Sequence, residues 1–526
     1  MFQILTFFFY FFLLLAFSFY FYTKKVAFTY WTRRNVPQLA PTFPLGDLHS
    51  MMKQKLGLGA FWAKLYHETK SRPFIGFYAL TKPALVVNDG NLMKNILARD
   101  AAMFPDRGTY SDDKRDPLSG GLFNQSGEKW RHMRTKLTPS FTSGKLKGMF
   151  QTMQDCGLRL KSFILTAAER NETLEMRDLM ARFTTDVVAS VAFGNQIDSI
   201  NNPHETFREM GRKTIGLTFK NLFRLGSLLL APNLLKITRM KSVDDDVEEF
   251  FTQLVQKNLE YREGNRVSRK DFLQLLIQLR NSGSIKLNDD WDTTVSQQKN
   301  LSLNEMAAQA FTFYVAGFET SSTTMSFCLY ELAKNRAALE KVQREIDRVL
   351  NRYDAEWSYD ALQEMNYLEN CIDETLRKYP PLPILQRSCI QKYKIPDSGV
   401  TIEPGTLVIL PIIGIQRDPL YFPEPMKFIP ERFTDVKYAE VLKKAYYPFG
   451  EGPRACIGTR MGKLMTKIGL ATILAKFDIQ LGLQHEAEGE LEISRNSILL
   501  APEYGIFLKA SVRDTTYFVR RASKAI

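Results

Sequence analysis

One short loop near the C-terminal end of the chain holds the residues best suited to chemistry. Residues Phe449–Gly458 follow the pattern F-x-x-G-x-R-x-C-x-G, with every fixed position filled. A cysteine thiolate is the reactive and metal-binding form, and it needs positive charge or hydrogen-bond donors nearby to stay deprotonated. Glycine N–H groups, the cation of Arg454 and a helix predicted to begin after Gly458 can supply both. The loop therefore predicts a thiolate metal ligand at Cys456, and a buried structural cysteine is the alternative.

An acid and an alcohol follow a glycine inside a helix-compatible segment that runs from about residue 304 to residue 335. Glu319 and Thr320 supply a carboxyl and a hydroxyl group, which can move protons as general acid–base catalysis requires. A glycine inside a helix costs about 1 kcal/mol relative to alanine. Gly317 therefore favours close approach of a ligand or a local widening of the helix. A capping motif or an ordinary buried threonine is the alternative.

Two further pairs of residues have helical spacing. Glu374 and Arg377 are three residues apart, and Trp130 and Arg134 are four apart, so the members of each pair share one helix face. Each pair alone is weak evidence, because an exposed ion pair contributes little and the Trp130 segment also looks like a solvated basic face.

Taken together and in this order, the motifs resemble the cytochrome P450 superfamily, the haem-thiolate monooxygenases, over roughly residues 37–510. The resemblance implies one large, mainly α-helical fold with a small β-rich lobe, preceded by one N-terminal transmembrane helix. Within the superfamily the chain is most similar to microsomal insect enzymes that oxidise xenobiotics, largely through the run Thr138–Lys147. One departure is Gln416, which stands where relatives usually have histidine and can alter a local hydrogen bond.

The resemblance implies a role for each motif. Cys456 would be the proximal iron ligand of haem b, iron protoporphyrin IX, and its thiolate favours O–O cleavage. Glu319 and Thr320 would help deliver protons to bound O2, the co-substrate. The implied structural triad is Glu374, Arg377 and Arg432. The implied cofactor-binding residues are Trp130, Arg134, Arg387, Phe449, Arg454, Cys456 and Gly458.

Apolar residues at matching positions are expected to line a substrate cavity, although each could equally belong to the core. They are Phe104, Leu122, Phe123, Phe313, Ala316, Ile384, Leu385, Ile498 and Leu500. An apolar lining predicts a lipophilic small-molecule substrate. A xenobiotic role, an ecdysteroid-like role and a fatty-acid role stay open, in that order of preference.

Two other functions compete with that of a monooxygenase. The first is a peroxide isomerase of the same fold, which needs neither O2 nor a reductase; the acid–alcohol pair argues against it. The second is a haem-binding or hydrophobic-ligand-binding protein without turnover, against which the intact motifs argue.

Composition narrows the range of partners. The 526 residues carry a net charge of +13 at pH 7, with five cysteines and five histidines. The cysteines show no paired spacing, which argues against a disulfide framework, and the histidines show no metal-binding pattern. Without a nucleic-acid motif, the basic balance favours a membrane surface and an acidic redox partner.

The resemblance implies that this redox partner is an NADPH-dependent flavoprotein reductase, and that a small haem electron-carrier protein is a second possible donor. Lys129, Arg131 and Lys136 are candidate contacts for the reductase. An ordinary solvated face is the alternative for each of these three residues.

The N-terminal segment predicts a membrane anchor. Residues 1–23 carry no charge and exceed the ~20 residues that span a bilayer as a helix. The cations that follow place the main domain on the cytosolic side of the endoplasmic reticulum membrane. The predicted units are a signal anchor at residues 1–23, a basic and proline-rich hinge at 24–46, a haem-thiolate monooxygenase domain at 47–511 and a basic tail at 512–526.

Four other segments complete the predicted organisation. A β-hairpin is expected from residues 74–80 and 84–88, and a loop over residues 103–123 is expected to roof the cavity. Residues 217–240 mix apolar and basic side chains, so this segment either dips into the bilayer or forms an ordinary core helix pair. Residues 281–302 are polar and predict a flexible linker.

Overall fold

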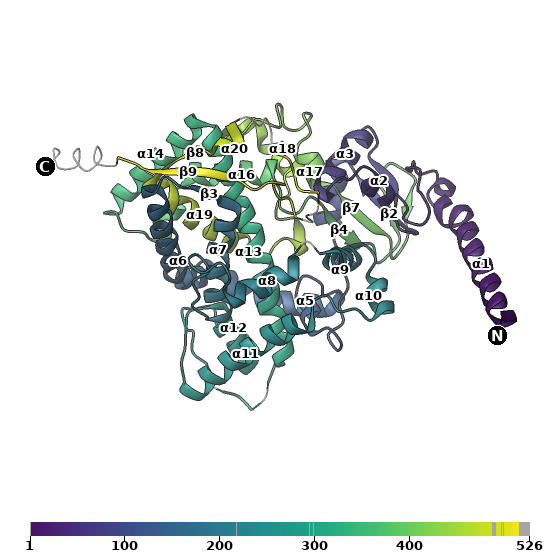
Figure 1. Cartoon of the computed structure of the whole chain (residues 1–526), viewed down its shortest axis with the longest axis horizontal. Coiled ribbons are helices and arrows are strands. Elements are labelled where there is room, and N and C mark those ends of the chain that lie inside the picture. The colour runs from purple at the N-terminus through teal and green to yellow at the C-terminus, as the bar shows by residue number, and fades with distance from the viewer. Residues whose placement is uncertain are drawn as a thin grey trace.

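The computed structural model describes residues 2–216, 218–293, 295–297, 299–486, 491–495, 497 and 499–514. Helices make up most of the body, and a small sheet lies at one end beside the N-terminal helix, which leads away from the body (Figure 1). The predicted fold class, mainly α with a small β-rich lobe, is confirmed.

The helices are α1 Phe2–Lys25, α2 Leu48–Lys53, α3 Leu58–Thr69, α4 Gly90–Lys94, α5 Gly127–Leu137, α6 Ser143–Glu169, α7 Met176–Val188, α8 Thr206–Ile215, α9 Phe219–Leu230, α10 Pro232–Thr238, α11 Asp245–Asn265, α12 Phe272–Ser282, α13 Leu303–Lys334, α14 Arg336–Arg352, α15 Tyr359–Gln363, α16 Asn366–Lys378, α17 Ile412–Gln416, α18 Ala439–Ala445, α19 Thr459–Lys476 and α20 Leu483–Glu486. The strands are β1 Phe74–Ala79, β2 Lys82–Val87, β3 Thr173–Glu175, β4 Leu385–Ser388, β5 Tyr393–Lys394, β6 Thr401–Ile402, β7 Leu407–Leu410, β8 Phe477–Leu481 and β9 Phe507–Val512.

Helix α13 is the central element of the helical body. It begins with a capping box, in which the Ser302 hydroxyl accepts from the Glu305 N–H and the Glu305 carboxylate accepts from the Ser302 N–H. These bonds satisfy N–H groups that a helix start leaves unpaired. The helix then runs for 32 residues and packs against α7, α11, α16 and α19. The acid–alcohol pair is therefore held on a long and mostly buried helix.

The main sheet has the strand order β1-β2-β7-β4. Strands β1 and β2 form the predicted antiparallel hairpin, with Phe74 opposite Val87. Strand β7 continues the sheet in parallel with β2, and β4 pairs antiparallel with β7 so that Arg387 lies opposite Val408. This pairing fixes the position of Arg387 on β4, the edge strand of the sheet.

Helix α1 is long and apolar enough to cross a membrane, judged by its length and composition. The chain after it turns into the β lobe. Trp31 is fully buried, and its indole Nε1 donates to the Phe77 carbonyl at 3.3 Å. Gly76 makes room for the ring, since a Cβ there would lie 2.4 Å from Trp31 atoms. Trp31, which lies in the predicted hinge, is thus packed in the hydrophobic core of the lobe.

The segment between α12 and α13 is anchored where the structure describes it, so the prediction of a flexible linker is wrong there. Trp291 is buried, and the Lys145 ammonium lies 4.3 Å from the centre of its ring. The same ammonium donates to the carbonyls of Asn288 and Asp290 at 2.9 and 3.1 Å. These contacts hold the described residues around Trp291 against α6.

Helices α9 and α10 are partly exposed. Leu228 and Leu235 are buried together with Tyr110, whereas Phe219 and Ile237 stand 86% and 76% exposed. The pair therefore differs from an ordinary core helix pair.

Replacement of Trp31 by alanine should destabilise the fold by about 3–5 kcal/mol, the cost of removing a buried tryptophan. The free energy of unfolding is measured by urea titration of the detergent-solubilised chain. Phe219→Ala is the matched exposed aromatic and should change stability by no more than about 0.5 kcal/mol. Equal effects of the two substitutions would show that Trp31 does not hold the hinge segment to the β lobe.

Candidate active site

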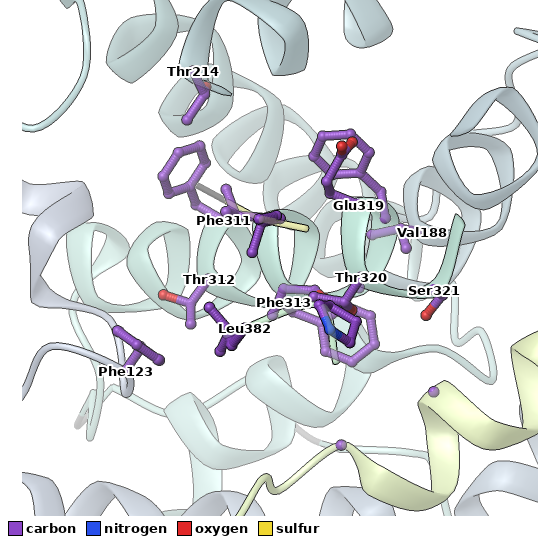
Figure 2. A pocket seen from close by; sticks show the side chains of 18 of the residues that line it. Phe123, Val188, Thr214, Phe311, Thr312, Phe313, Glu319, Thr320, Ser321 and Leu382 are labelled. Carbon is purple, nitrogen blue, oxygen red and sulfur yellow. The ribbon is translucent and has the colours of Figure 1, made fainter. Parts of the chain in front are cut away.

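A cavity of about 1030 Å³ lies between α13 and the cysteine loop (Figure 2). Its wall is mostly apolar, with the α13 residues Phe313, Ala316 and Thr320 on one side and Cys456 on the other. The residues predicted from sequence that line this one cavity are Leu122, Phe123, Trp130, Arg134, Phe313, Ala316, Glu319, Thr320, Leu385, Phe449, Cys456 and Gly458. The structure therefore brings together motifs that lie more than three hundred residues apart in the chain.

The cysteine loop is shaped by two glycines with positive φ angles. Gly450 and Gly452 have φ of 72° and 70°, a region that glycine enters without steric cost. A Cβ at Gly452 would also lie 2.0 Å from the Leu97 carbonyl oxygen. The Cys456 N–H donates to the Phe449 carbonyl at 2.8 Å, which closes the loop. Cys456 is exposed to the cavity and lies just before α19, whose N-terminal dipole favours an anionic sulfur.

Four arginines form a cluster beside the cavity, here named the arginine cradle: Arg107, Arg134, Arg387 and Arg454. Arg387 and Arg454 are buried, and Arg107 and Arg134 line the cavity wall. The Arg107 guanidinium donates to the Arg454 carbonyl at 3.1 Å, and the Arg134 guanidinium donates to the Ala455 carbonyl at 2.8 Å. The Arg454 guanidinium lies 3.8 Å from the centre of the Trp130 ring. The cradle joins β4, the roof loop, α5 and the cysteine loop.

The cradle has more positive charge than the protein neutralises. Burial, together with the charges of Arg107 and Arg454, lowers the pKa of Arg387 to about 9. Burial and the charge of Arg107 lower the pKa of Arg454 to about 9 as well, although Asp106 lies 3.0 Å away and opposes the shift. Among the described residues, Arg387 Nη2 and Arg454 Nη1 are buried without a hydrogen-bond partner. The cradle is therefore suited to an anionic ligand with several acceptor oxygens.

The acid and the alcohol of α13 point in different directions (Figure 2). The Thr320 hydroxyl lines the cavity and donates to the Ala316 carbonyl at 2.5 Å. The Glu319 carboxylate is mostly buried and pairs with the Arg177 guanidinium of α7 at 2.9 Å. Sequence reasoning did not find Arg177, because no local pattern links α7 to α13.

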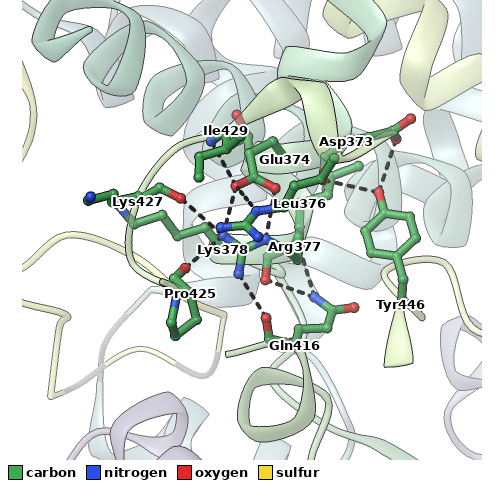
Figure 3. Close-up of polar contacts among 12 residues, drawn as sticks. Asp373, Glu374, Leu376, Arg377, Lys378, Gln416, Pro425, Lys427, Ile429 and Tyr446 are labelled. Carbon is green, nitrogen blue, oxygen red and sulfur yellow. Dashed lines mark hydrogen bonds and ion pairs between the residues drawn. The ribbon is translucent and has the colours of Figure 1, made fainter. Parts of the chain in front are cut away.

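Behind the loop, a buried ion-pair network joins α16 to the segment that contains Arg432, and Figure 3 shows its α16 part. Glu374 and Arg377 form two contacts of 2.8 Å on α16, and Arg432 Nε lies 3.4 Å from the same carboxylate. All three side chains are fully buried. Breaking such a network by removing one partner costs about 3–5 kcal/mol, because it leaves a buried charge uncompensated. The three predicted triad residues thus meet: the spacing of Glu374 and Arg377 predicted their contact, and the family resemblance implied that Arg432 joins them.

Gln416 connects this network to the cysteine loop. Its side-chain Nε2 donates to the carbonyls of Leu376 and Arg377, each at 3.0 Å, and its Oε1 accepts from the Tyr447 N–H at 2.9 Å. Gln416 is fully buried. The residue that departs from the usual pattern therefore makes three hydrogen bonds between α16 and the segment entering the loop.

Three predicted substrate residues lie outside the cavity wall. Phe104 is buried against Tyr393 in the β lobe, while Ile384 and Leu500 are buried in the main core. Apolar spacing cannot separate a core position from a cavity position, which explains these misplacements. Ile498 lies outside the described residues, as do residues 515–526 of the predicted tail. The lining residues Arg107, Thr312 and Leu382 were missed, since none of them belongs to a motif or to the apolar residues that the sequence analysis selected.

The fold and the site together define a member of the cytochrome P450 family, whose family model matches residues 47–509. The chain belongs to this family and is a haem monooxygenase. Probable cytochrome P450 6d5 of Drosophila melanogaster is 40% identical over 494 residues, which cover 93% of this chain and 96% of that relative. Cytochrome P450 6d3 of Musca domestica is 38% identical over 511 residues, covering 94% and 97%. Cytochrome P450 6A1 of Musca domestica is 37% identical over 496 residues, covering 93% and 95%.

The site fits the haem that the family implies. Cys456 lines the cavity. The buried nitrogens of Arg387 and Arg454 that have no hydrogen-bond partner suit a ligand with carboxylate groups. Among the described residues, no cluster of three or more histidine, cysteine, aspartate or glutamate side chains could hold a bare metal ion. A single thiolate and a group of arginines instead suit a metal carried by an anionic macrocycle.

The arginine cradle predicts that haem-free chain discriminates against esterified haem. Haem dimethyl ester lacks the carboxylate charges, and a hydrogen bond to a charged group contributes roughly 1.5–3 kcal/mol, so its affinity should be at least about tenfold lower than that of haem. Absorbance titration of the haem-free chain measures both affinities.

Arg387→Gln should narrow the difference between the two ligands, because it removes one partner of the carboxylates. Arg99→Gln is the matched control, since Arg99 is an exposed arginine, and it should leave the difference unchanged. Equal affinity for haem and its ester in the unaltered chain would contradict the assigned role of the cradle.

Proposed function

We propose that the chain is a microsomal monooxygenase that inserts one oxygen atom of O2 into a lipophilic substrate, first of all a xenobiotic. The electrons come from an NADPH-dependent flavoprotein reductase, and the cofactor is haem b. One observation carries the proposal: Cys456 and Thr320 face a single apolar cavity that has the arginine cradle beside it.

Each part of the protein has a separate task in this proposal. Haem, when bound, supplies an iron that activates O2, and its thiolate ligand favours O–O cleavage. Cys456 supplies that thiolate. Arg107, Arg134, Arg387 and Arg454 hold the haem carboxylates, with Trp130 packed beneath Arg454. Phe449 and Gly458 form part of the wall next to the cysteine.

Thr320 and Glu319 move protons. Because the Thr320 hydroxyl donates to Ala316, its oxygen lone pairs face the cavity and can accept a hydrogen bond. Glu319 is held by Arg177, which itself lines the cavity and is about one-third exposed. Movement of this pair would connect Glu319 to water at the mouth of the cavity while the apolar wall keeps water from the substrate.

The N-terminal helix and the exposed apolar residues of α9 and α10 support location at a membrane, which we assign to the endoplasmic reticulum with the domain in the cytosol. Three cations on α5 are the proposed reductase contacts: Lys129 and Arg131, which are exposed, and Lys136, which is half-buried. Lys129 pairs with Asp113, and Arg131 lies 3.2 Å from Glu128. These exposed pairs are weak enough to exchange for an acidic partner. A small haem electron-carrier protein is a second candidate donor.

The reaction is tested with full-length chain, reductase and a lipophilic xenobiotic in lipid vesicles. Oxygenated product should require NADPH, O2 and the reductase together. Rearrangement of an organic peroxide without NADPH, O2 or a second substrate would contradict the proposal and indicate a peroxide isomerase. Absence of any turnover by the haem-loaded chain would also contradict it.

Thr320→Ala should retain haem and consume NADPH, while the product formed per NADPH falls roughly tenfold or more, because proton transfer by a positioned side chain contributes at least about a hundredfold. Thr320→Ser keeps the hydroxyl and is the control, expected to stay near the unaltered chain. Unchanged coupling of NADPH to product in Thr320→Ala would remove Thr320 from the mechanism.

A further inference from the structure

The cations of the cavity wall are paired with carboxylates, some of which lie behind the wall. Outside the arginine cradle, every described lysine or arginine of the wall lies within ion-pair distance of a carboxylate. Three examples are Arg177–Glu319 at 2.9 Å, Arg224–Asp244 at 2.7 Å and Lys463–Glu369 at 3.0 Å. A carboxylate on a substrate would therefore have to displace the carboxylate of one of these pairs or stay unpaired in the cavity, which is costly away from water.

Thr312 presents an unpaired hydroxyl group on the same wall. It lies on α13 beside Phe313, in the cavity wall that also contains Phe123 and Leu382 (Figure 2). The other cavity-lining threonines of α13 donate to the carbonyl four residues earlier, Thr320 to Ala316 and Thr324 to Thr320. In the described structure the Thr312 hydroxyl makes no such bond and has no other hydrogen-bond partner.

The roof loop keeps this hydroxyl in place. A Cβ at Gly121 would lie 1.7 Å from Thr312 Oγ1, so the Gly121 backbone packs directly against it. Gln309, one turn earlier on α13, accepts from the Leu122 N–H at 2.9 Å and holds the loop there. Because the hydroxyl is accessible from the cavity and makes no hydrogen bond within the described structure, a ligand that hydrogen-bonds to Thr312 would be favoured.

We propose that Thr312 is a specificity-determining residue that binds one oxygen function of an uncharged lipophilic substrate, namely a hydroxyl, carbonyl or ether oxygen. This inference rests on the proposed monooxygenase function and names its substrate class. It disfavours carboxylates such as free fatty acids, because the chamber has no uncommitted cation outside the cradle in the part that the structure describes.

The place of Thr312 on α13 also sets a distance. Thr312, Ala316 and Thr320 are spaced four residues apart and therefore share one helix face. At a rise of about 1.5 Å per residue, Thr312 lies roughly 6 Å from Ala316 and roughly 12 Å from Thr320 along the axis. The proposed role of Thr320 places oxygen delivery between the levels of Ala316 and Thr320. An extended carbon chain advances roughly 1.3 Å per bond, so a carbon held there lies about five to nine bonds from the bound oxygen.

Three probes that differ only in one end group test the proposal: dodecane, 1-dodecanol and dodecanoate. Haem-loaded full-length chain in phosphatidylcholine vesicles is titrated with each and followed by haem absorbance, with protein-free vesicles as the partition control. Thr312→Val should lower the dodecanol-to-dodecane affinity ratio roughly three- to tenfold, the range of one neutral hydrogen bond. Thr312→Ser should keep the ratio, and dodecanoate should bind at least about tenfold more weakly than dodecanol.

The proposal is overturned by an unchanged ratio in Thr312→Val, by dodecanoate binding as tightly as dodecanol, or by failure of all three probes to bind. Analysis of the products formed with reductase and NADPH distinguishes failure of the Thr312 proposal from failure of the proposed monooxygenase function. Hydroxylation of dodecanol about five to nine carbons from its oxygen supports both. Binding as predicted without oxygenated product supports the Thr312 site and contradicts the monooxygenase. Products scattered equally in the unaltered chain and in Thr312→Val support the monooxygenase and overturn the Thr312 assignment.

Discussion

Buried positive charge beside a cavity is the constraint on which the site depends. Arg387 and Arg454 are removed from water and lie near Arg107. Asp106 pairs with Arg454 at 3.0 Å. Uncompensated charge in such a setting favours binding of an anion. The same residues come from the roof loop, the β lobe and the cysteine loop, so an anionic cofactor would join these segments as well as neutralise them.

The cysteine loop is also supported by a buried network in which one carboxylate pairs with two guanidinium groups. Glu374 pairs with Arg377 and Arg432. Gln416 donates to the Arg377 carbonyl and accepts from the Tyr447 N–H, just before the cysteine loop. The ion-pair network thus supports one side of the loop, and a bound cofactor would contact the side that faces the cavity. This division explains why the residues behind the loop are structural while those in front of it are exposed to the cavity.

Sequence reasoning succeeded where chemistry or spacing is local. The cysteine loop, the acid–alcohol pair and the E-x-x-R motif each lie within a few residues, and helical or turn geometry follows from their spacing. It failed where a partner comes from a distant segment: Arg107 and Arg177 reach the site only through tertiary packing. Apolar residues were placed correctly only in part, because Phe104 and Leu122 look alike in sequence although one is in the core and the other in the cavity wall.

Thiolate ligation at Cys456 is the claim on which the chemistry rests, and the carbon monoxide difference spectrum of the reduced, haem-loaded chain tests it most directly. The unaltered chain should show a strongly red-shifted Soret band, and Cys456→His should lose that band while retaining haem. A folded, haem-loaded chain without the red-shifted band, or a band that persists in Cys456→His, would contradict thiolate ligation at this position.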